Sequence, residues 1–153
     1  MKRLFTLFAI LFFGFALAVP ASAAEFATKD EAVAFVKKAV AYAKEVGIEK
    51  AAAEFSAKDG KWQDRDLYLI VADIKGIRVA HGLNAKLIGK SLADSVDVTG
   101  KAYGKEFMDG AATKGSGWVE YMFVDPISKK QLPKEGYYEK SGDYVFLAGV
   151  YKR

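Results

Sequence analysis

The stretch DLYLIVADIKGIRVAH, residues 66–81, decides the fold of this chain. Residues 67–72 are β-branched, aromatic or aliphatic and are bounded by charge on both sides, which predicts a strand. Residues 73–76 have the composition of a tight turn, with Asp73 bonding its own backbone, and residues 77–81 predict the returning strand. The segment is therefore expected to form an antiparallel hairpin.

A helical pattern precedes the hairpin. Thr28 and Glu31 have the spacing of a capping box, in which each side chain bonds the backbone N–H of the other residue. Apolar residues then recur at helical spacing to Val46, which predicts an amphipathic helix. Gly47 interrupts the pattern, and a shorter helix is expected over residues 48–56.

The chain after the hairpin supplies one more helix and three more strands. Its expected order is a loop over 82–100, a helix over 102–114 ending at Gly115, a strand over 117–125, a loop over 126–136, and strands over 137–140 and 144–151 around a turn at 141–143. This order predicts an α+β fold, an antiparallel sheet with its helices segregated from it.

The first residues have the pattern of a secretory signal peptide. Lys2 and Arg3 precede an uncharged apolar run over residues 4–19, and Pro20 leads into Ala-Ser-Ala at 21–23. A retained membrane anchor is the alternative, but the run is short for a span of about 20 residues. We therefore expect cleavage after Ala23, a periplasmic location, and one domain over residues 24–153.

Composition excludes several classes of function. The chain has no cysteine, which rules out disulfides, thiol catalysis and cysteine-ligated metals. Removing Lys2 and Arg3 lowers the net charge from +4 to +2, and no basic stripe with interleaved aromatic residues is present, so nucleic acid is not an expected partner. No long apolar run follows Val19, so we expect no transmitter module on this chain.

A set of short motifs in a fixed order resembles the single Cache domain, type 2, a family of extracytoplasmic sensory domains. The motifs are DLYLIVAD at 66–73, Gly76, VAHG at 79–82, LIGKSL at 87–92, GWVEY at 117–121, Pro133-Lys134 with Tyr137, and GVY at 149–151. The resemblance implies a PAS-like antiparallel sheet with the long N-terminal helix packed on it. It also implies a small pocket on the other face of the sheet, suited to small carboxylates.

Two basic residues in these motifs are the main ligand candidates. His81 is the only histidine, and it either donates to a carboxylate or closes the corner after its strand by bonding backbone. Protonation near its ordinary pKa would strengthen the first role. Lys134 lies in the predicted loop, and the resemblance places it at the pocket rim, where its ammonium group suits a carboxylate.

Aromatic residues supply the expected pocket walls. Tyr121 and Phe123 share one face of their predicted strand, and Trp118 lies on the opposite face. Tyr68 and Tyr137 join the ligand-binding candidates, so the full set is His81, Tyr121, Lys134, Tyr137, Tyr68, Phe123 and Trp118. Core packing explains the aromatic members almost equally well.

The sequence favours ligand binding over catalysis. It contains no nucleophile or phosphate-loop motif, and a lone histidine cannot make a usual metal site, so we expect no catalytic residue, metal or cofactor. The predicted function is periplasmic, sensory-type binding of a small organic acid such as acetate, lactate or pyruvate. The alternative is an accessory protein that pairs through residues 28–56 and has a vestigial pocket. A membrane-bound sensor, another exported protein or a second copy remain open as partners.

Overall fold

The computed structural model describes residues 25–58 and 60–153. The predicted signal peptide and its cleavage site lie outside these residues. Within them, no helix is both long enough and apolar enough to cross a membrane.

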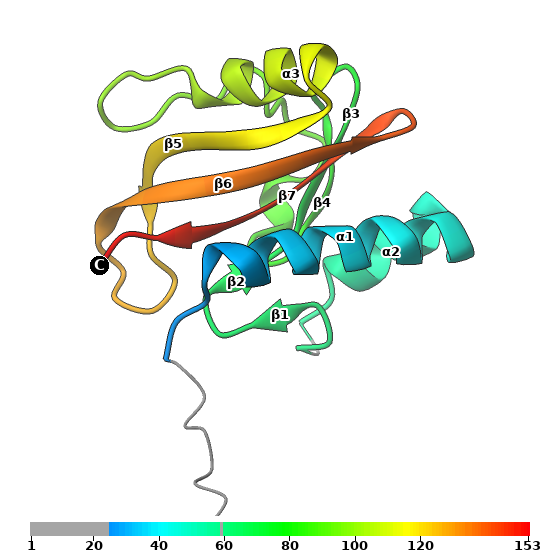
Figure 1. Cartoon of the computed structure of the whole chain (residues 1–153), viewed down its shortest axis with the longest axis horizontal. Helices are drawn as coiled ribbons and strands as arrows, with labels where there is room; N and C mark the ends of the chain where they lie inside the picture. The colour runs from blue at the N-terminus through cyan, green and yellow to red at the C-terminus, as the bar shows by residue number, and fades with distance from the viewer. Residues whose placement is uncertain (1–24, 59) are drawn as a thin grey trace, which may run out of the picture.

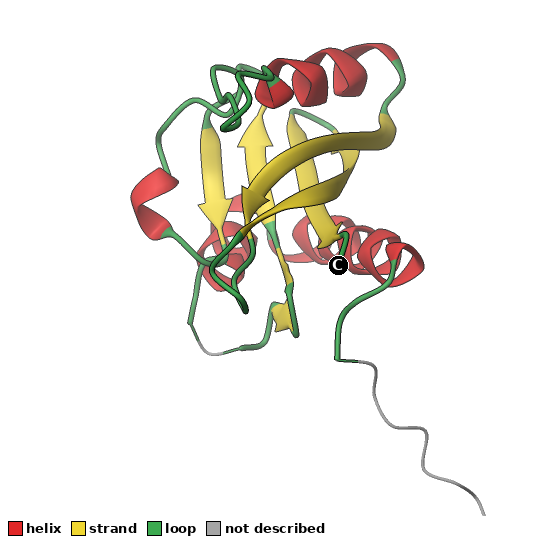
Figure 2. Ribbon diagram, turned by 90° about the vertical axis from the view of Figure 1, so that its left-hand side faces the viewer, coloured by secondary structure: helices red, strands yellow, loops and turns green. Residues whose placement is uncertain are grey.

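A five-stranded antiparallel sheet lies between two layers of helices (Figures 1 and 2). Helices α1 (Lys29–Val46) and α2 (Ile48–Phe55) cover one face, and α3 (Tyr103–Thr113) covers the other. The strand order is β4-β3-β7-β6-β5, with every neighbouring pair antiparallel. The bounds are β3 Ile70–Asp73, β4 Arg78–His81, β5 Ser116–Val124, β6 Gln131–Ser141 and β7 Tyr144–Tyr151. The predicted α+β, PAS-like architecture is confirmed.

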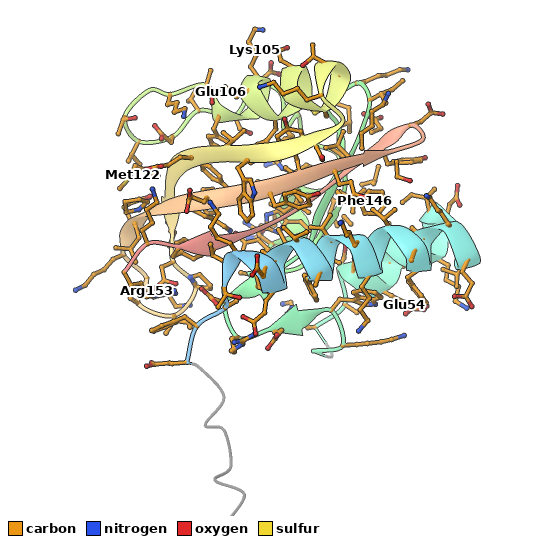
Figure 3. All side chains as sticks on the ribbon, in the orientation of Figure 1. Glu54, Lys105, Glu106, Met122, Phe146 and Arg153 are labelled. Carbon is orange, nitrogen blue, oxygen red and sulfur yellow. The ribbon has the colours of Figure 1, made fainter. Side chains whose placement is uncertain are left out.

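Helix α1 begins and packs as its sequence predicts. Thr28 Oγ1 accepts from the Glu31 backbone N–H at 3.3 Å, and Glu31 Oε2 accepts from the Thr28 backbone N–H at 2.7 Å, which completes the capping box. The buried stripe of α1 faces the sheet and consists of Ala32, Val36, Ala39, Val40 and Ala43. Phe146 on β7 fills the space between the sheet and this helix layer (Figure 3).

The structure corrects the predicted hairpin in one respect. The strand expected over residues 67–72 is interrupted at Leu69, because β2 (Leu67–Tyr68) pairs with the short β1 (Gln63–Asp64) outside the main sheet. The returning strand is β4, and the turn matches its prediction. Asp73 Oδ1 accepts from the backbone N–H groups of Lys75 and Ile77 at 2.9 and 2.8 Å.

A second correction concerns the segment expected to be a loop over residues 126–136. Strand β6 begins at Gln131, six residues before the predicted start at 137, so Lys134 lies in a strand. The sequence argued against a strand here because proline has no backbone N–H to donate to a neighbouring strand. Pro133 is tolerated because β7 ends at Tyr151, which pairs with Lys134, one position short of the proline.

Gly104 allows α3 to approach the loop that precedes it. A Cβ atom at this position would overlap the carbonyl oxygen of Leu92, and the Gly104 backbone N–H donates to Ser95 O at 3.1 Å. We expect Gly104→Ala to lower the free energy of unfolding by about 1–3 kcal/mol, because backbone must shift to admit the methyl group. Urea denaturation tests this. Lys105→Ala, on the exposed side of the same helix (Figure 3), is the control and should change stability by less than about 0.5 kcal/mol.

Candidate ligand-binding site

A cavity of about 370 Å³ lies on the α3 face of the sheet. Its floor comes from β3, β4, β5 and β7, one wall from α3, and the other wall from residues 87–96. The lining residues are Ile70, Arg78, His81, Leu87, Lys90, Ser91, Leu92, Ser95, Val96, Tyr103, Phe107, Tyr121, Phe123 and Leu147. This volume is at the small end of the range for ligand pockets, roughly 300–1,000 Å³.

Arg78 extends from β4 into the cavity and forms hydrogen bonds with the wall made by residues 87–96. Nη1 donates to Ser91 O at 2.7 Å and Nη2 donates to Ser95 Oγ at 2.7 Å. Nε is buried and has no hydrogen-bond partner among the described residues. A buried, unpaired donor on a cation is unusual and calls for an acceptor.

His81, at the end of β4, uses one ring nitrogen for structure. Nδ1 accepts from the backbone N–H groups of Leu83 and Asn84 at 3.3 and 3.1 Å, so Nδ1 is unprotonated and the neutral ring carries its hydrogen on Nε2. Burial, helped by the charges of Arg78 and Lys134, lowers the pKa of His81 to about 4. The corner-closing role is therefore present. The expected protonation near the ordinary pKa is wrong, and any hydrogen bond to a ligand comes from neutral imidazole.

Lys134 is buried in β6, with 2% of its surface exposed, rather than at a loop rim. Nζ donates to the Tyr68 hydroxyl at 2.8 Å and lies 4.1 Å from the centre of that ring. The Tyr151 ring centre is 4.7 Å away. Burial lowers the pKa of Lys134 to about 7, although Asp66 and Asp125 partly oppose that effect. An anion that approaches Lys134 therefore favours the protonated, charged form of its side chain.

The aromatic candidates divide between the two faces of the sheet. Tyr121 and Phe123 line the cavity, and Tyr68 stacks on His81 with ring centres 5.5 Å apart. Trp118 and Tyr137 lie on the opposite face, packed against the α1 layer. The alternation predicted for β5 is confirmed, and the structure brings neither Trp118 nor Tyr137 to the cavity.

The site is strongly basic for an interior. Neither Arg78 nor Lys134 forms an ion pair with a carboxylate in the part of the chain that the structure describes. No group of three or more potential metal-ligating residues occurs there either. Arg78 and His81 line the cavity, and Lys134 lies beside it, with Nζ 5.6 Å from the ring centre of Phe123, which does line it.

Sequence reasoning missed Arg78 and Tyr103. Tyr103 begins α3 and stacks on Tyr121, with ring centres 4.3 Å apart. For Arg78 the sequence did contain a signal. A charged residue stands between the apolar residues Ile77 and Val79, on the same face of the strand as Ala80, which is buried. For Tyr103 the sequence offered none, since an aromatic residue in an amphipathic helix ordinarily packs in the core.

The lowered pKa of His81 predicts a pH-dependent stability. Between about pH 6.5 and pH 4 the unfolded chain binds a proton that the folded protein excludes, so stability falls as the pH falls through this window. The contribution is about 1–3 kcal/mol. We expect His81→Gln to lose less stability than the wild type between pH 7 and pH 5, as measured by urea denaturation. Parallel curves for the two proteins would contradict the assignment.

A second cavity, of about 380 Å³, lies between α2 and β4, with Glu49 as its charged residue. It contains no buried cation, so it offers little to an anion.

The alternative of pairing through residues 28–56 predicts an exposed apolar patch there. The exposed large hydrophobic residues of the described chain lie elsewhere, at Ile74, Leu83, Ile88, Val96, Val98, Val124 and Ile127.

Comparison with known proteins agrees with this architecture. Residues 28–150 match the family described as Single Cache domain 2. A methyl-accepting chemotaxis protein from Vibrio parahaemolyticus is 25% identical, with a TM-score of 0.68 over 80% of this chain and 87% of that one. The periplasmic sensor domain of a chemotaxis protein is 27% identical, with a TM-score of 0.63 over 81% and 90%.

A third solved structure, a Cache chemosensory domain described for carboxylic acid recognition, has a TM-score of 0.67 over 81% of this chain and 92% of that one. At 20% identity it shows the shared fold. No curated protein matches the chain.

Proposed function

Because the chain belongs to the single Cache domain 2 family, we propose that it senses a small carboxylate, such as acetate, lactate or pyruvate, in the cavity beside α3. Cache domains are extracytoplasmic ligand-binding domains of sensory proteins, and the chain is one of them.

The observation that carries the proposal is the pair of buried cations without a counter-anion. Arg78 has a free buried donor at Nε, and Lys134 has three N–H bonds, of which the Tyr68 hydroxyl accepts one. A carboxylate supplies two acceptor oxygens and a negative charge for direct contact with these donors. Charge-assisted hydrogen bonds of this kind are about twice as strong as neutral ones.

The remaining groups limit the ligand to a small molecule with a short apolar part. His81 Nε2–H adds a neutral donor, and the rings of Tyr103, Tyr121 and Phe123 give apolar walls. The cavity, with a volume of about 370 Å³, has room for such a molecule. Aromatic walls with a few placed polar groups are a common composition for small-molecule sites.

We further propose that the chain is exported, with cleavage after Ala23, and reports to a membrane-bound sensor or another exported protein. The hydrophobic run at residues 4–19 and the periplasmic location of a structural relative support this assignment. Mass spectrometry of the protein recovered from the periplasmic fraction tests it. A mature mass beginning at Ala24 is expected, and an intact residue 1 would contradict cleavage.

A thermal-shift screen of the purified protein tests the ligand class. At about a hundredfold excess over the dissociation constant, a bound acid should add about 2.7 kcal/mol and raise the melting temperature by roughly 5–10 °C. Acetamide and lactamide, which keep the shape and lack the charge, serve as controls. The proposal fails if no acid stabilises the protein or if the amides stabilise it equally.

A further inference from the structure

Two carboxylates near Lys134 are completely buried although they do not line the cavity. Asp66 precedes β2 and Asp125 follows β5, and both side chains have 0% exposure. Arg153, which follows β7, bridges them. Its Nη1 donates to Asp66 Oδ2 at 2.8 Å and its Nη2 donates to Asp125 Oδ1 at 2.7 Å.

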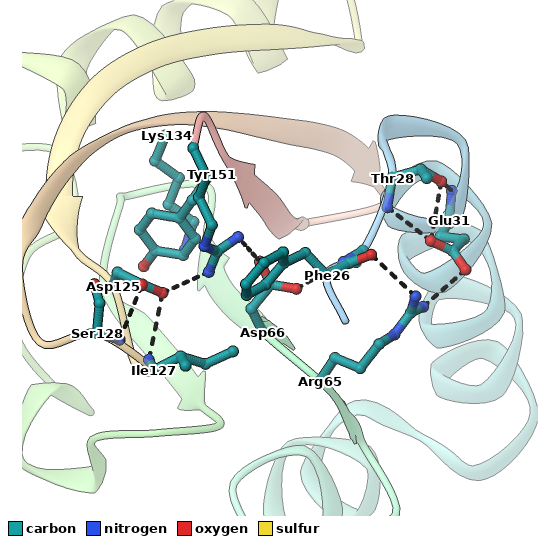
Figure 4. A network of polar contacts seen from close by, with 12 residues as sticks. Phe26, Thr28, Glu31, Arg65, Asp66, Asp125, Ile127, Ser128, Lys134 and Tyr151 are labelled. Atoms are coloured by element: carbon teal, nitrogen blue, oxygen red, sulfur yellow. Dashed lines mark hydrogen bonds and ion pairs between the residues drawn. The ribbon is translucent and has the colours of Figure 1, made fainter. Parts of the chain in front are cut away.

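One aromatic ring connects this network to the ligand site. The Tyr151 ring centre lies 4.7 Å from Lys134 Nζ and 5.4 Å from Arg153 Cζ. Asp66 is also two residues before Tyr68, whose hydroxyl accepts the Lys134 hydrogen bond. Figure 4 shows Lys134 and Tyr151 next to the bridged carboxylates. The negative charges of the two acids therefore act electrostatically on Lys134 across a short distance of protein interior.

The balance of charge in this network depends on one residue. With Arg153 in place, the two carboxylates and the guanidinium carry a net charge of about −1, and without it they carry about −2. Asp66 also accepts from the Ala27 backbone N–H at 2.9 Å, and Asp125 from the backbone N–H groups of Ile127 and Ser128 at 3.3 and 3.0 Å. Although burial opposes it, the hydrogen bonds from Ser128 and Ile127 lower the pKa of Asp125, so its negative charge remains when Arg153 is lost.

We propose that Arg153 sets the affinity of the site for an anionic ligand without touching it, by neutralising the buried acid pair Asp66–Asp125. The inference rests on the proposed function. An anion at Lys134 and the acid pair repel each other across a poorly screened interior, and Arg153 removes part of that repulsion. By reciprocity, a bound anion strengthens the attachment of Arg153 to the acids. The same attachment holds Phe26, whose ring centre lies 3.7 Å from Arg153 Cζ.

A charge-matched pair of variants tests the proposal. Acetate, lactate and pyruvate are titrated into each protein by calorimetry at about pH 5.5, which is below the pKa of Lys134, so that the lysine is charged. We expect Arg153→Gln to weaken binding roughly fivefold. Asp66→Asn combined with Arg153→Gln restores the wild-type net charge and should recover most of the affinity, and the two amides can still bond each other.

A second measurement needs no ligand. Nitrogen NMR of the lysine Nζ should show a higher pKa for Lys134 in Arg153→Gln, because the exposed negative field favours its charged form, and a return toward the wild-type value in the double variant. Unchanged affinity in Arg153→Gln overturns the inference. A double variant that binds as weakly as the single one also overturns it, because that result would show that Arg153→Gln acts by loosening the structure and not by changing the charge. If the wild type binds none of the acids, the proposed function fails. The NMR result still reports whether Arg153 and the acid pair act electrostatically on Lys134.

Discussion

Lys134→Met should abolish carboxylate binding and at the same time make the protein more stable. At pH 7 the unfolded chain carries a charged lysine, whereas the folded protein holds the side chain buried with a pKa of about 7. That difference costs about 4 kcal/mol of folding free energy. Methionine has a similar length and no charge to bury, so we expect a net gain of about 1–3 kcal/mol, after loss of the bond to Tyr68.

The pH dependence of this effect provides its control. Between about pH 7 and pH 10.5 the unfolded wild type binds a proton that the folded protein lacks, so wild-type stability rises with pH. The advantage of Lys134→Met, measured by urea denaturation, should therefore shrink across this window. A constant difference would show that the gain comes from packing. Destabilisation at every pH would contradict the view that Lys134 is retained for ligand binding.

Arg78→Met should also abolish binding, but with the opposite effect on stability. Arg78 makes two hydrogen bonds from a charged group to the wall at Ser91 and Ser95, and such bonds contribute about 1.5–3 kcal/mol each. We expect a loss of about 2–4 kcal/mol in the free energy of unfolding and a reduction in affinity of at least about a hundredfold, since the variant loses both the positive charge and the Nε donor.

Arg78→Lys separates the two contributions of this residue. Lysine keeps the charge but lacks the planar fork that reaches Ser91 and Ser95 together. Its affinity and its stability should both lie between those of the wild type and Arg78→Met. Wild-type affinity in Arg78→Met would remove this residue from the site.

The elements of the fold were predictable where local pattern decides them. The capping box at Thr28 and the alternation in β5 are local features, and both are confirmed. The start of β6 was not predictable, because Pro133 argues against a strand unless the neighbouring strand is known to end. Strand β7 is distant in sequence, so its end could not enter the prediction.

The candidate site was predicted in part for the same reason. His81 and Lys134 came from the family resemblance, and the structure places both beside Tyr68. The burial of Lys134 and the lowered pKa of His81 depend on which residues surround them in space. The bridge from Arg153 to Asp66 joins residues 87 positions apart, and no spacing rule relates them.

The central claim is that the cavity beside α3 recognises the negative charge of a small carboxylate. Calorimetric titration of the wild-type protein with each acid and with the amide of the same shape tests it most directly. The account predicts saturable binding of at least one of acetate, lactate and pyruvate, and at least roughly tenfold weaker binding of the matching amide. Equal affinity for an acid and its amide, or binding that persists undiminished in Lys134→Met, would contradict it.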